Sequence, residues 1–256
     1  KRRVEYFTDD ADVQAFLGPF REMQSSVEPE RPLTIGPYMN DPDLINNKYQ
    51  LHLAMEAARG VIEEVFAGYA ALSGRHYPVV DSYRMDDADA ALFILNSAAE
   101  TAKDAADSLR QEGLKVGVIS PNVIRPFPYE GVQAAARGLG SLLIAERADS
   151  YGGNGGSMSF EVKASLHDDP ENRSRCLTRI YGLGGRDYYT EDAEEMLRLA
   201  VQAAGGEGSD GLRRFDYHGV TPGDPNHDLG PFQEPIPETA SRHGLIKVEQ
   251  DPETGR

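Results

Sequence analysis

The chain has 256 residues, of which 39% are hydrophobic and 27% charged, and a formal net charge of −16. This composition is typical of a soluble globular protein. The negative charge argues against nucleic-acid binding, because clustered lysines and arginines are needed to hold a phosphate backbone. No apolar run approaches the roughly 18–20 residues that span a bilayer, so no membrane contact is expected. The single cysteine, Cys176, excludes an internal disulfide and suits a reducing cytoplasm.

Residues 1–84 are expected to form a connecting arm and a long helix. Aspartates at 9, 10 and 12 favour a short helix over 9–17, which Gly18 and Pro19 should end. From 43 to 73 the apolar residues recur at helical intervals and share one face: Leu44, Leu51, Met55, Ala58, Ile62, Val65, Tyr69 and Leu72. We expect this long amphipathic helix to pack against the following domain or a neighbouring subunit.

Residues 85–205 alternate short apolar runs with helical patterns, which predicts parallel strands covered by helices. Strands are expected at 90–95, 115–120, 141–146 and 175–181. Helices are expected at 97–112, after Pro128, after Gly156 and at 191–204, where Thr190 is the expected cap. The predicted fold class is α/β, a small doubly wound sheet of four or five strands. Cys176 falls within the last of these strands, where a buried structural thiol is expected.

Residues 206–256 change in composition and are expected to form an irregular Pro-rich tail. Six prolines, with several glycines and acidic residues, preclude regular structure over most of this range. Such a tail is either disordered or wraps a partner. Apolar residues favour wrapping because they supply anchors for docking: Phe215, Tyr217, Leu229, Phe232 and Ile236. His218 and His227 lie in the same tail and are expected to be exposed loop residues.

A glycine run after the strand at 141–146 is the first candidate site. It contains Gly152, Gly153, Gly155 and Gly156, followed by Ser157. Its spacing is not that of the dinucleotide fingerprint, and no Gly-Lys-Ser/Thr is present. The loop's N–H groups and the next helix terminus could receive an anion or a partner's carboxylate. Plain close packing is the alternative interpretation.

Three charged residues complete the candidates. Glu146 and Arg147 end the strand before the glycine run, where they serve either a functional site or an ion pair that shapes the loop. Arg125, between Ile124 and Pro126, either clamps a carboxylate or phosphate or braces its turn through backbone carbonyls. No catalytic residue is predicted, since no serine or cysteine nucleophile has a recognisable base. The histidines show no metal-ligand spacing, and no metal ligand is predicted.

Several of these stretches resemble the α subunit of 2-oxoacid:ferredoxin oxidoreductases, of which pyruvate:ferredoxin oxidoreductase is the best known. The similarity lies in Lys-Val-Gly-Val-Ile at 115–119, Ile-Arg-Pro-Phe-Pro at 124–128, Glu146-Arg147 and the loop at 152–156. Asn96-Ser97 to Lys103 and the run 83–89 also resemble family segments. The resemblance covers roughly residues 4–204 and leaves the tail unassigned.

The resemblance implies that residues 85–205 form a three-layer α/β/α domain like the carboxyl-terminal domain of transketolase. It also implies a complex that decarboxylates a 2-oxoacid oxidatively on thiamine diphosphate and Mg²⁺. Electrons then pass through [4Fe-4S] clusters to ferredoxin, and the acyl group usually passes to coenzyme A. The implied partners are a domain that binds the cofactor's pyrimidine, a β subunit and an iron–sulfur subunit.

This chain is expected to bind none of these cofactors directly, and one cysteine cannot supply the four thiolates of a cluster. Its implied role is to scaffold the active-site interface, with Arg125 and the 146–156 loop in contact with partners. Whether it is separately encoded, cleaved or part of a longer chain stays open, as does the identity of the 2-oxoacid. The alternatives are a free-standing α/β module that binds small anions, and a component of a transketolase or 2-oxoacid dehydrogenase without iron–sulfur clusters.

Overall fold

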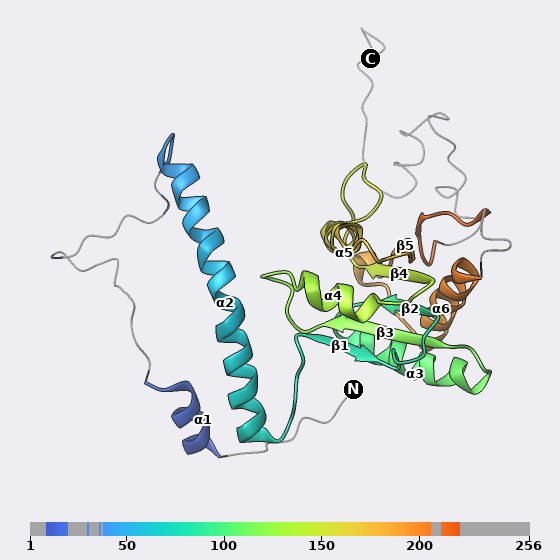
Figure 1. The fold of residues 1–256 in the computed structure, drawn as a ribbon, viewed down its shortest axis with the longest axis horizontal. Coiled ribbons are helices and arrows are strands. Elements are labelled where there is room, and N and C mark those ends of the chain that lie inside the picture. Colours follow the sequence, from blue (N-terminus) through green and yellow to red (C-terminus); the bar gives the residue numbers. More distant parts are fainter. Residues whose placement is uncertain (1–8, 20–29, 31–35, 37, 206–210, 221–256) are drawn as a thin grey trace, which may run out of the picture.

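The structure is a computed structural model that describes residues 9–19, 30, 36, 38–205 and 211–220 (Figure 1). Its helices are α1 (Asp10–Leu17), α2 (Asp43–Ser73), α3 (Ser97–Gln111), α4 (Tyr129–Ala136), α5 (Ser157–Asp168) and α6 (Thr190–Ala204), with a 3-10 turn at Leu183–Gly185. Its strands are β1 (Val80–Tyr83), β2 (Ala90–Phe93), β3 (Val116–Pro121), β4 (Ser141–Glu146), β5 (Arg175–Ile180) and β6 (Phe215–Tyr217).

The strands form one six-stranded sheet in the order β1-β3-β2-β4-β5-β6. All neighbours are parallel except β1, which runs antiparallel to β3 at one edge. The α/β class is therefore confirmed. The expected count of four or five strands is wrong: β1 and β6 extend the sheet at both edges, outside the range 85–205. Both strands are short, and β6 lies in a part of the chain where frequent prolines and glycines argue against regular structure, so the sequence did not predict it.

Helices cover both faces of the sheet and produce three layers. On one face the small side chains of α3 and α6 pack closely on β2 and β4, with Ala102, Ala105 and Ala200 fully buried. On the other face α4 and α5 cover Phe93, Ile119 and Ile144. Central strands that are buried on both faces need apolar side chains on both faces. The sequences of β2 and β4 are therefore largely continuous apolar runs. The expected α/β/α architecture is confirmed.

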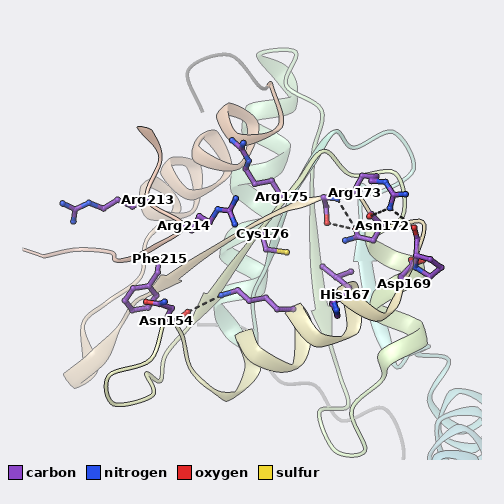
Figure 2. Close-up of a pocket in the computed structure, with 14 residues that line it drawn as sticks. Asn154, His167, Asp169, Asn172, Arg173, Arg175, Cys176, Arg213, Arg214 and Phe215 are labelled. Carbon is purple, nitrogen blue, oxygen red and sulfur yellow. Dashed lines mark hydrogen bonds between the residues drawn. The ribbon is translucent and has the colours of Figure 1, made fainter. Parts of the chain in front are cut away.

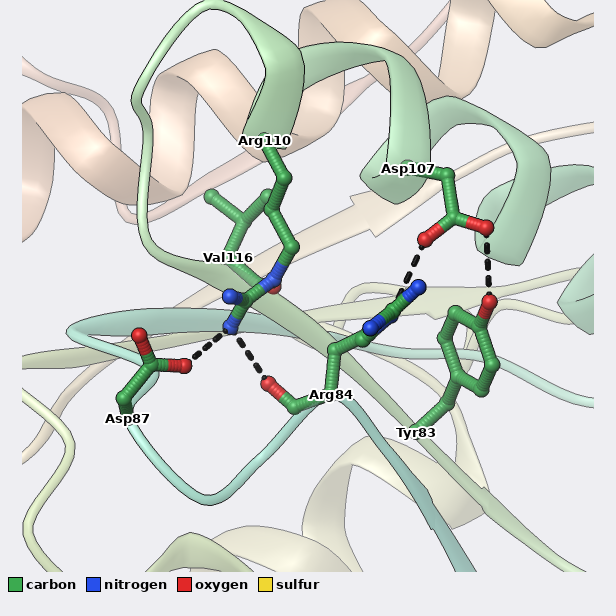
Figure 3. A network of polar contacts seen from close by, with 6 residues as sticks. All are labelled: Tyr83, Arg84, Asp87, Asp107, Arg110 and Val116. Atoms are coloured by element: carbon green, nitrogen blue, oxygen red, sulfur yellow. Dashed lines mark hydrogen bonds and ion pairs between the residues drawn. The ribbon is translucent and has the colours of Figure 1, made fainter.

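A polar network ties β1 and the following turn to α3 (Figure 3). Arg110 donates from Nε to the Val116 carbonyl at 2.8 Å and from Nη2 to the Arg84 carbonyl at 2.7 Å and to Asp87 at 2.6 Å. Asp107 accepts from the Tyr83 hydroxyl at 2.7 Å and from Arg84 Nε at 3.0 Å. These contacts fix the turn that brings the antiparallel strand to the sheet edge.

The arm consists of α1 and α2, and α2 stands beside the α/β domain and meets it near the middle of its length, at the loop before α4 (Figure 1). Arg59 donates to the Phe127 carbonyl at 3.2 Å and lies 3.5 Å from Glu130 of α4. Met55, Ala58, Ile62, Tyr69 and Leu72 of the expected stripe are half-buried. Ala70, which is 9% exposed, is the only buried residue of α2. The predicted helix 43–73 is present, and most of its surface is exposed.

Candidate functional site

The candidate residues gather at the carboxyl edge of the parallel strands. Arg125 follows β3, and the loop from Arg147 to Gly156 follows β4. In open α/β sheets this edge is where ligands and partners bind. No helix in the described ranges 9–19, 38–205 and 211–220 is long and apolar enough to cross a membrane.

Glu146, at the last position of β4, caps the N-terminus of α5. Its carboxylate is 7% exposed and accepts the backbone N–H groups of Gly156 at 3.1 Å, Met158 at 2.8 Å and Ser159 at 2.9 Å. A carboxylate at a helix N-terminus satisfies free N–H groups and interacts favourably with the helix dipole. An outside anion would need the same N–H groups and would be repelled by this charge.

Close packing accounts for two glycines of the loop. A Cβ on Gly156 would lie 2.3 Å from the Ala148 carbonyl oxygen and 2.6 Å from Glu146 Oε1. Gly155 has φ +145° and would meet the Ser159 hydroxyl. At these two positions the geometry favours the packing interpretation that the sequence left open. Gly152, Gly153 and Ser157 lie nearer the surface, and Ser157 is exposed.

Arg147 is exposed and connects its loop to the loop after β5. Its Nη2 donates to the Gly182 carbonyl at 3.1 Å, and its guanidinium carbon lies 6.0 Å from the centre of the Tyr181 ring. The Tyr217 hydroxyl donates to Asp149 at 2.6 Å. Tyr217 was expected to anchor the tail on a partner, and in this structure its hydroxyl is engaged within the chain. Phe215, another expected anchor, lies in β6, and Leu229, Phe232 and Ile236 lie outside the described residues.

Arg125 braces its turn and keeps a half-exposed guanidinium. Nη1 donates to the Ile124 carbonyl at 2.6 Å, and Nη2 lies 3.3 Å from Glu161 of α5. The Tyr129 hydroxyl donates to the other Glu161 oxygen at 2.5 Å, and this contact raises the pKa of Tyr129. The side chain of Arg125 is 49% exposed. It can therefore brace the turn and still meet a partner carboxylate.

The expectation that His218 is an exposed loop residue is wrong. Its side chain is 9% exposed, and Nε2 lies 2.7 Å from Asp192 at the start of α6. His218 directly follows β6, and its N–H donates to the Ile180 carbonyl, so the missed strand explains the missed contact. The second tail histidine, His227, lies outside the described residues.

The donors present do not fit the metals or cofactors that the resemblance implies. Within the described parts of the chain, no group of three or more histidine, cysteine, aspartate or glutamate side chains could hold a metal ion. The whole sequence has one cysteine, which is half-buried in β5. At the N-terminus of α5, where a diphosphate could have bound, the Glu146 carboxylate fills the position.

Comparisons with known proteins agree with the sequence resemblance. Residues 88–193 match the family described as pyruvate:ferredoxin oxidoreductase core domain II. Pyruvate synthase subunit PorA of Pyrococcus horikoshii is 36% identical over 195 residues, 76% of this chain and 49% of that protein. Ketoisovalerate oxidoreductase subunit VorA of Pyrococcus abyssi is 31% identical over 194 residues, 73% of this chain and 48% of that protein.

The chain thus spans about half the length of the curated relatives it matches. Among solved structures, a split-gene transketolase aligns with a TM-score of 0.39 and 17% identity, over 51% of this chain and 44% of the other.

Proposed function

The chain belongs to the 2-oxoacid:ferredoxin oxidoreductase family, and from this premise we propose that it is the scaffolding part of an α subunit in such an enzyme. The observation that carries the proposal is the 36% identity over 195 residues to a pyruvate synthase subunit. The complex would convert a 2-oxoacid and coenzyme A to an acyl-coenzyme A and CO₂. The two electrons released would reduce ferredoxin.

The catalytic cofactors would be carried by other parts of the complex. Thiamine diphosphate with Mg²⁺ would supply the decarboxylation chemistry, and [4Fe-4S] clusters would conduct the electrons. We assign both to other domains or subunits, because the donor groups described above do not fit either. The proposed partners are the domain that binds the cofactor's pyrimidine, the β subunit, the iron–sulfur subunit and ferredoxin, all in the cytoplasm.

The exposed apolar surface of α2 supports the scaffolding role. Seven large apolar residues of this helix are between 45% and 67% exposed: Leu44, Ile45, Tyr49, Leu51, Leu53, Val61 and Val65. An exposed apolar surface of this extent is typical of an interaction site. We propose that residues 1–84 form the arm that joins the α/β domain, residues 85–205, to the cofactor-binding part of the complex. We propose that the tail, 206–256, wraps a partner over its remaining length.

The partner-facing residues of the carboxyl edge are proposed to be Arg125, Arg147 and Ser157. All three side chains lie at the surface after β3 or β4, whereas Glu146 and Gly156 are buried beneath them. We expect Arg125→Ala to lower turnover or assembly of the complex at least tenfold while the chain keeps its melting temperature. Arg137→Ala, at an exposed arginine that ends α4, is the matched control. Unchanged turnover and stoichiometry in Arg125→Ala would remove Arg125 from the interface.

The proposed function is tested on the complex isolated from the native cells through a tag on this chain. Iron, thiamine diphosphate and subunit masses are measured, and reduction of ferredoxin is followed with pyruvate, 2-ketoisovalerate or 2-oxoglutarate plus coenzyme A. We expect both cofactors and turnover of at least one 2-oxoacid. A complex with thiamine diphosphate and no iron would support the dehydrogenase-type alternative. A monomer without either cofactor would support the anion-binding module.

A further inference from the structure

A basic groove lies at the edge of the sheet opposite β1 (Figure 2). Its floor is made by Cys176 of β5 and Phe215 of β6, and Lys163 and Leu166 of α5 form one wall. The loop 169–174 and the start of β6 complete it. The groove exists because α5 packs over β4, which leaves β5 and β6 less covered on that face. Its volume is about 990 Å³.

The charge of the groove is opposite to that of the chain. Five cationic residues line it: Lys163, Arg173, Arg175, Arg213 and Arg214. Asp169 is the single acidic residue among the lining residues, whereas the chain as a whole carries −16. Such a concentration of positive charge attracts an anionic partner.

Several of these cations have unused hydrogen-bonding capacity. Within the described residues, no hydrogen bond or ion pair is made by the side chain of Arg175 or Arg214. Lys163 Nζ donates to the Asn154 carbonyl at 3.3 Å, one partner for three N–H groups. Burial lowers the pKa of Lys163, because the charged amine has lost water and the nearby Cys176 and Glu146 do not offset this loss.

The shape of the groove distinguishes between classes of anion. Figure 2 shows Arg175 on the opposite side of β5 from Cys176, and Arg173 and Arg213 directed away from each other, so the guanidinium groups surround the edge of the sheet and do not face a common centre. A single phosphate or carboxylate therefore cannot contact them together, and it would fill a small part of a groove of this volume. Carboxylates spaced along an extended chain can contact all of them.

We propose that this groove binds an acidic polypeptide segment of another subunit, whose aspartate or glutamate side chains pair with Lys163, Arg175 and Arg214. The relatives named above are themselves called subunits, so partner chains are expected. The groove lies beside β6, at the opposite edge of the sheet from β1. It therefore adds a second docking surface to the one proposed for α2.

A peptide-binding measurement on the full chain tests the charge assignment. Fluorescein-labelled hexaglutamate is titrated at 50 mM salt and followed by fluorescence polarisation. We expect Arg175→Glu/Arg214→Glu to weaken binding at least tenfold. The control Lys48→Glu/Lys115→Glu changes charge equally at exposed sites outside the groove and should stay within twofold. Equal losses in both variants, or no binding, would overturn the proposal, as would tighter binding of tripolyphosphate.

Cross-linking of the isolated complex tests the source of the carboxylate. A water-soluble carbodiimide joins a carboxylate to an amine as an amide, and the water removed hydrates the reagent to a urea. We expect Lys163 to be linked to an aspartate or glutamate of another subunit. Lys163→Arg should abolish that link and keep peptide binding, because it retains the charge without the reactive amine. A link from Lys163 to residues 221–241 of the same chain, or an unlinked Lys163, would overturn the proposal.

Discussion

At the scale of single residues, Gly156 is a position where the structure leaves no room for a side chain. A Cβ there would overlap the Ala148 carbonyl and the Glu146 carboxylate that caps α5. We expect Gly156→Ala to lower the free energy of unfolding by about 1–3 kcal/mol, since overpacking forces the cap apart. Urea denaturation of the original chain and the variant measures this difference in unfolding free energy. Gly60→Ala on α2 is the control, because nothing lies within 4 Å of its Cβ position. A Gly156→Ala chain as stable as Gly60→Ala would contradict the close-packed loop.

Asp192 gives the chain a specific acid sensitivity. Burial acts to raise its pKa, but the Tyr189 N–H and His218 outweigh it, so the pKa of Asp192 lies below its usual value. A lowered folded-state pKa adds stability above the unfolded pKa of about 3.9, and this stability is lost as pH falls through the folded value. We expect Asp192→Asn to be less stable by about 1 kcal/mol at pH 6–7.

The stability difference between Asp192→Asn and the original chain should then shrink as the pH is lowered below about 4. Thermal melts from pH 7 to pH 3 measure it. Glu191→Gln, an exposed carboxylate one position away, is the control and should show no such dependence. A difference that stayed constant with pH would rule out the lowered pKa as its cause.

Sequence reasoning placed the candidate residues correctly along the chain but could not give their contacts. It located Glu146 at the end of a strand and the glycines beside a helix start. The helix cap they form joins residues 10–13 positions apart, which no spacing rule predicts. Thr190 was expected to cap α6, yet it is the first helical residue and Tyr189 holds the cap position. Helix ends shift in this way because several neighbouring polar groups compete for the same N–H groups.

At the scale of elements, the turn from β1 to β2 depends on the forked side chain of Arg110. Its guanidinium reaches two carbonyls and Asp87 at once and is 21% exposed. A lysine has one nitrogen and cannot reproduce this geometry. We expect Arg110→Lys to cost about 1–2 kcal/mol in urea denaturation, because acceptors near the sheet lose their donor.

Arg198→Lys is the matched control for this element. Arg198 pairs with Glu112 at 2.7 Å, but about half of each side chain is exposed. Exposed pairs are worth roughly 0–1 kcal/mol, so the control should change stability by less than about 0.5 kcal/mol. Equal losses in the two variants would show that the fork of Arg110 contributes nothing beyond a surface ion pair.

The central elements could be predicted from sequence because burial on both faces demands continuous apolar runs. The two edge strands could not be predicted in this way. β1 contains Asp81 and Ser82 and is only four residues long, so it does not resemble a buried strand. β6 has three residues and pairs with β5 only because the chain returns there after α6. For α2, the periodicity predicted the helix, but a periodic pattern does not identify the partner that its apolar surface meets.

At the scale of the whole molecule, two docking surfaces lie toward opposite edges of the sheet. The arm meets the α/β domain near β1 and α4, and the basic groove lies beside β6. Five strand spacings of about 4.8 Å separate the edge strands by roughly 24 Å. One surface is apolar and the other cationic. A chain with these two surfaces can connect two different parts of a complex without their competing.

The separation of the two surfaces predicts additive effects on assembly. Ile45→Ser/Tyr49→Ser changes side chains of α2 that are 67% and 60% exposed, so the isolated chain should keep its melting temperature. We expect this arm variant and the groove variant Arg175→Glu/Arg214→Glu each to weaken assembly about tenfold. Sites more than about 10 Å apart couple by less than about 0.5 kcal/mol. The combined variant should therefore weaken assembly about a hundredfold, to within a factor of about two.

Mass photometry of the reconstituted complex over a dilution series measures all three variants. Asn46→Ser/Asn47→Ser is the control, because it changes exposed polar side chains of the same helix and should assemble as the original chain does. A combined loss no greater than that of either variant alone would contradict two separate docking surfaces, since both changes would then act on one contact. Full additivity would mean that the arm and the groove each hold a part of the complex by their own contacts.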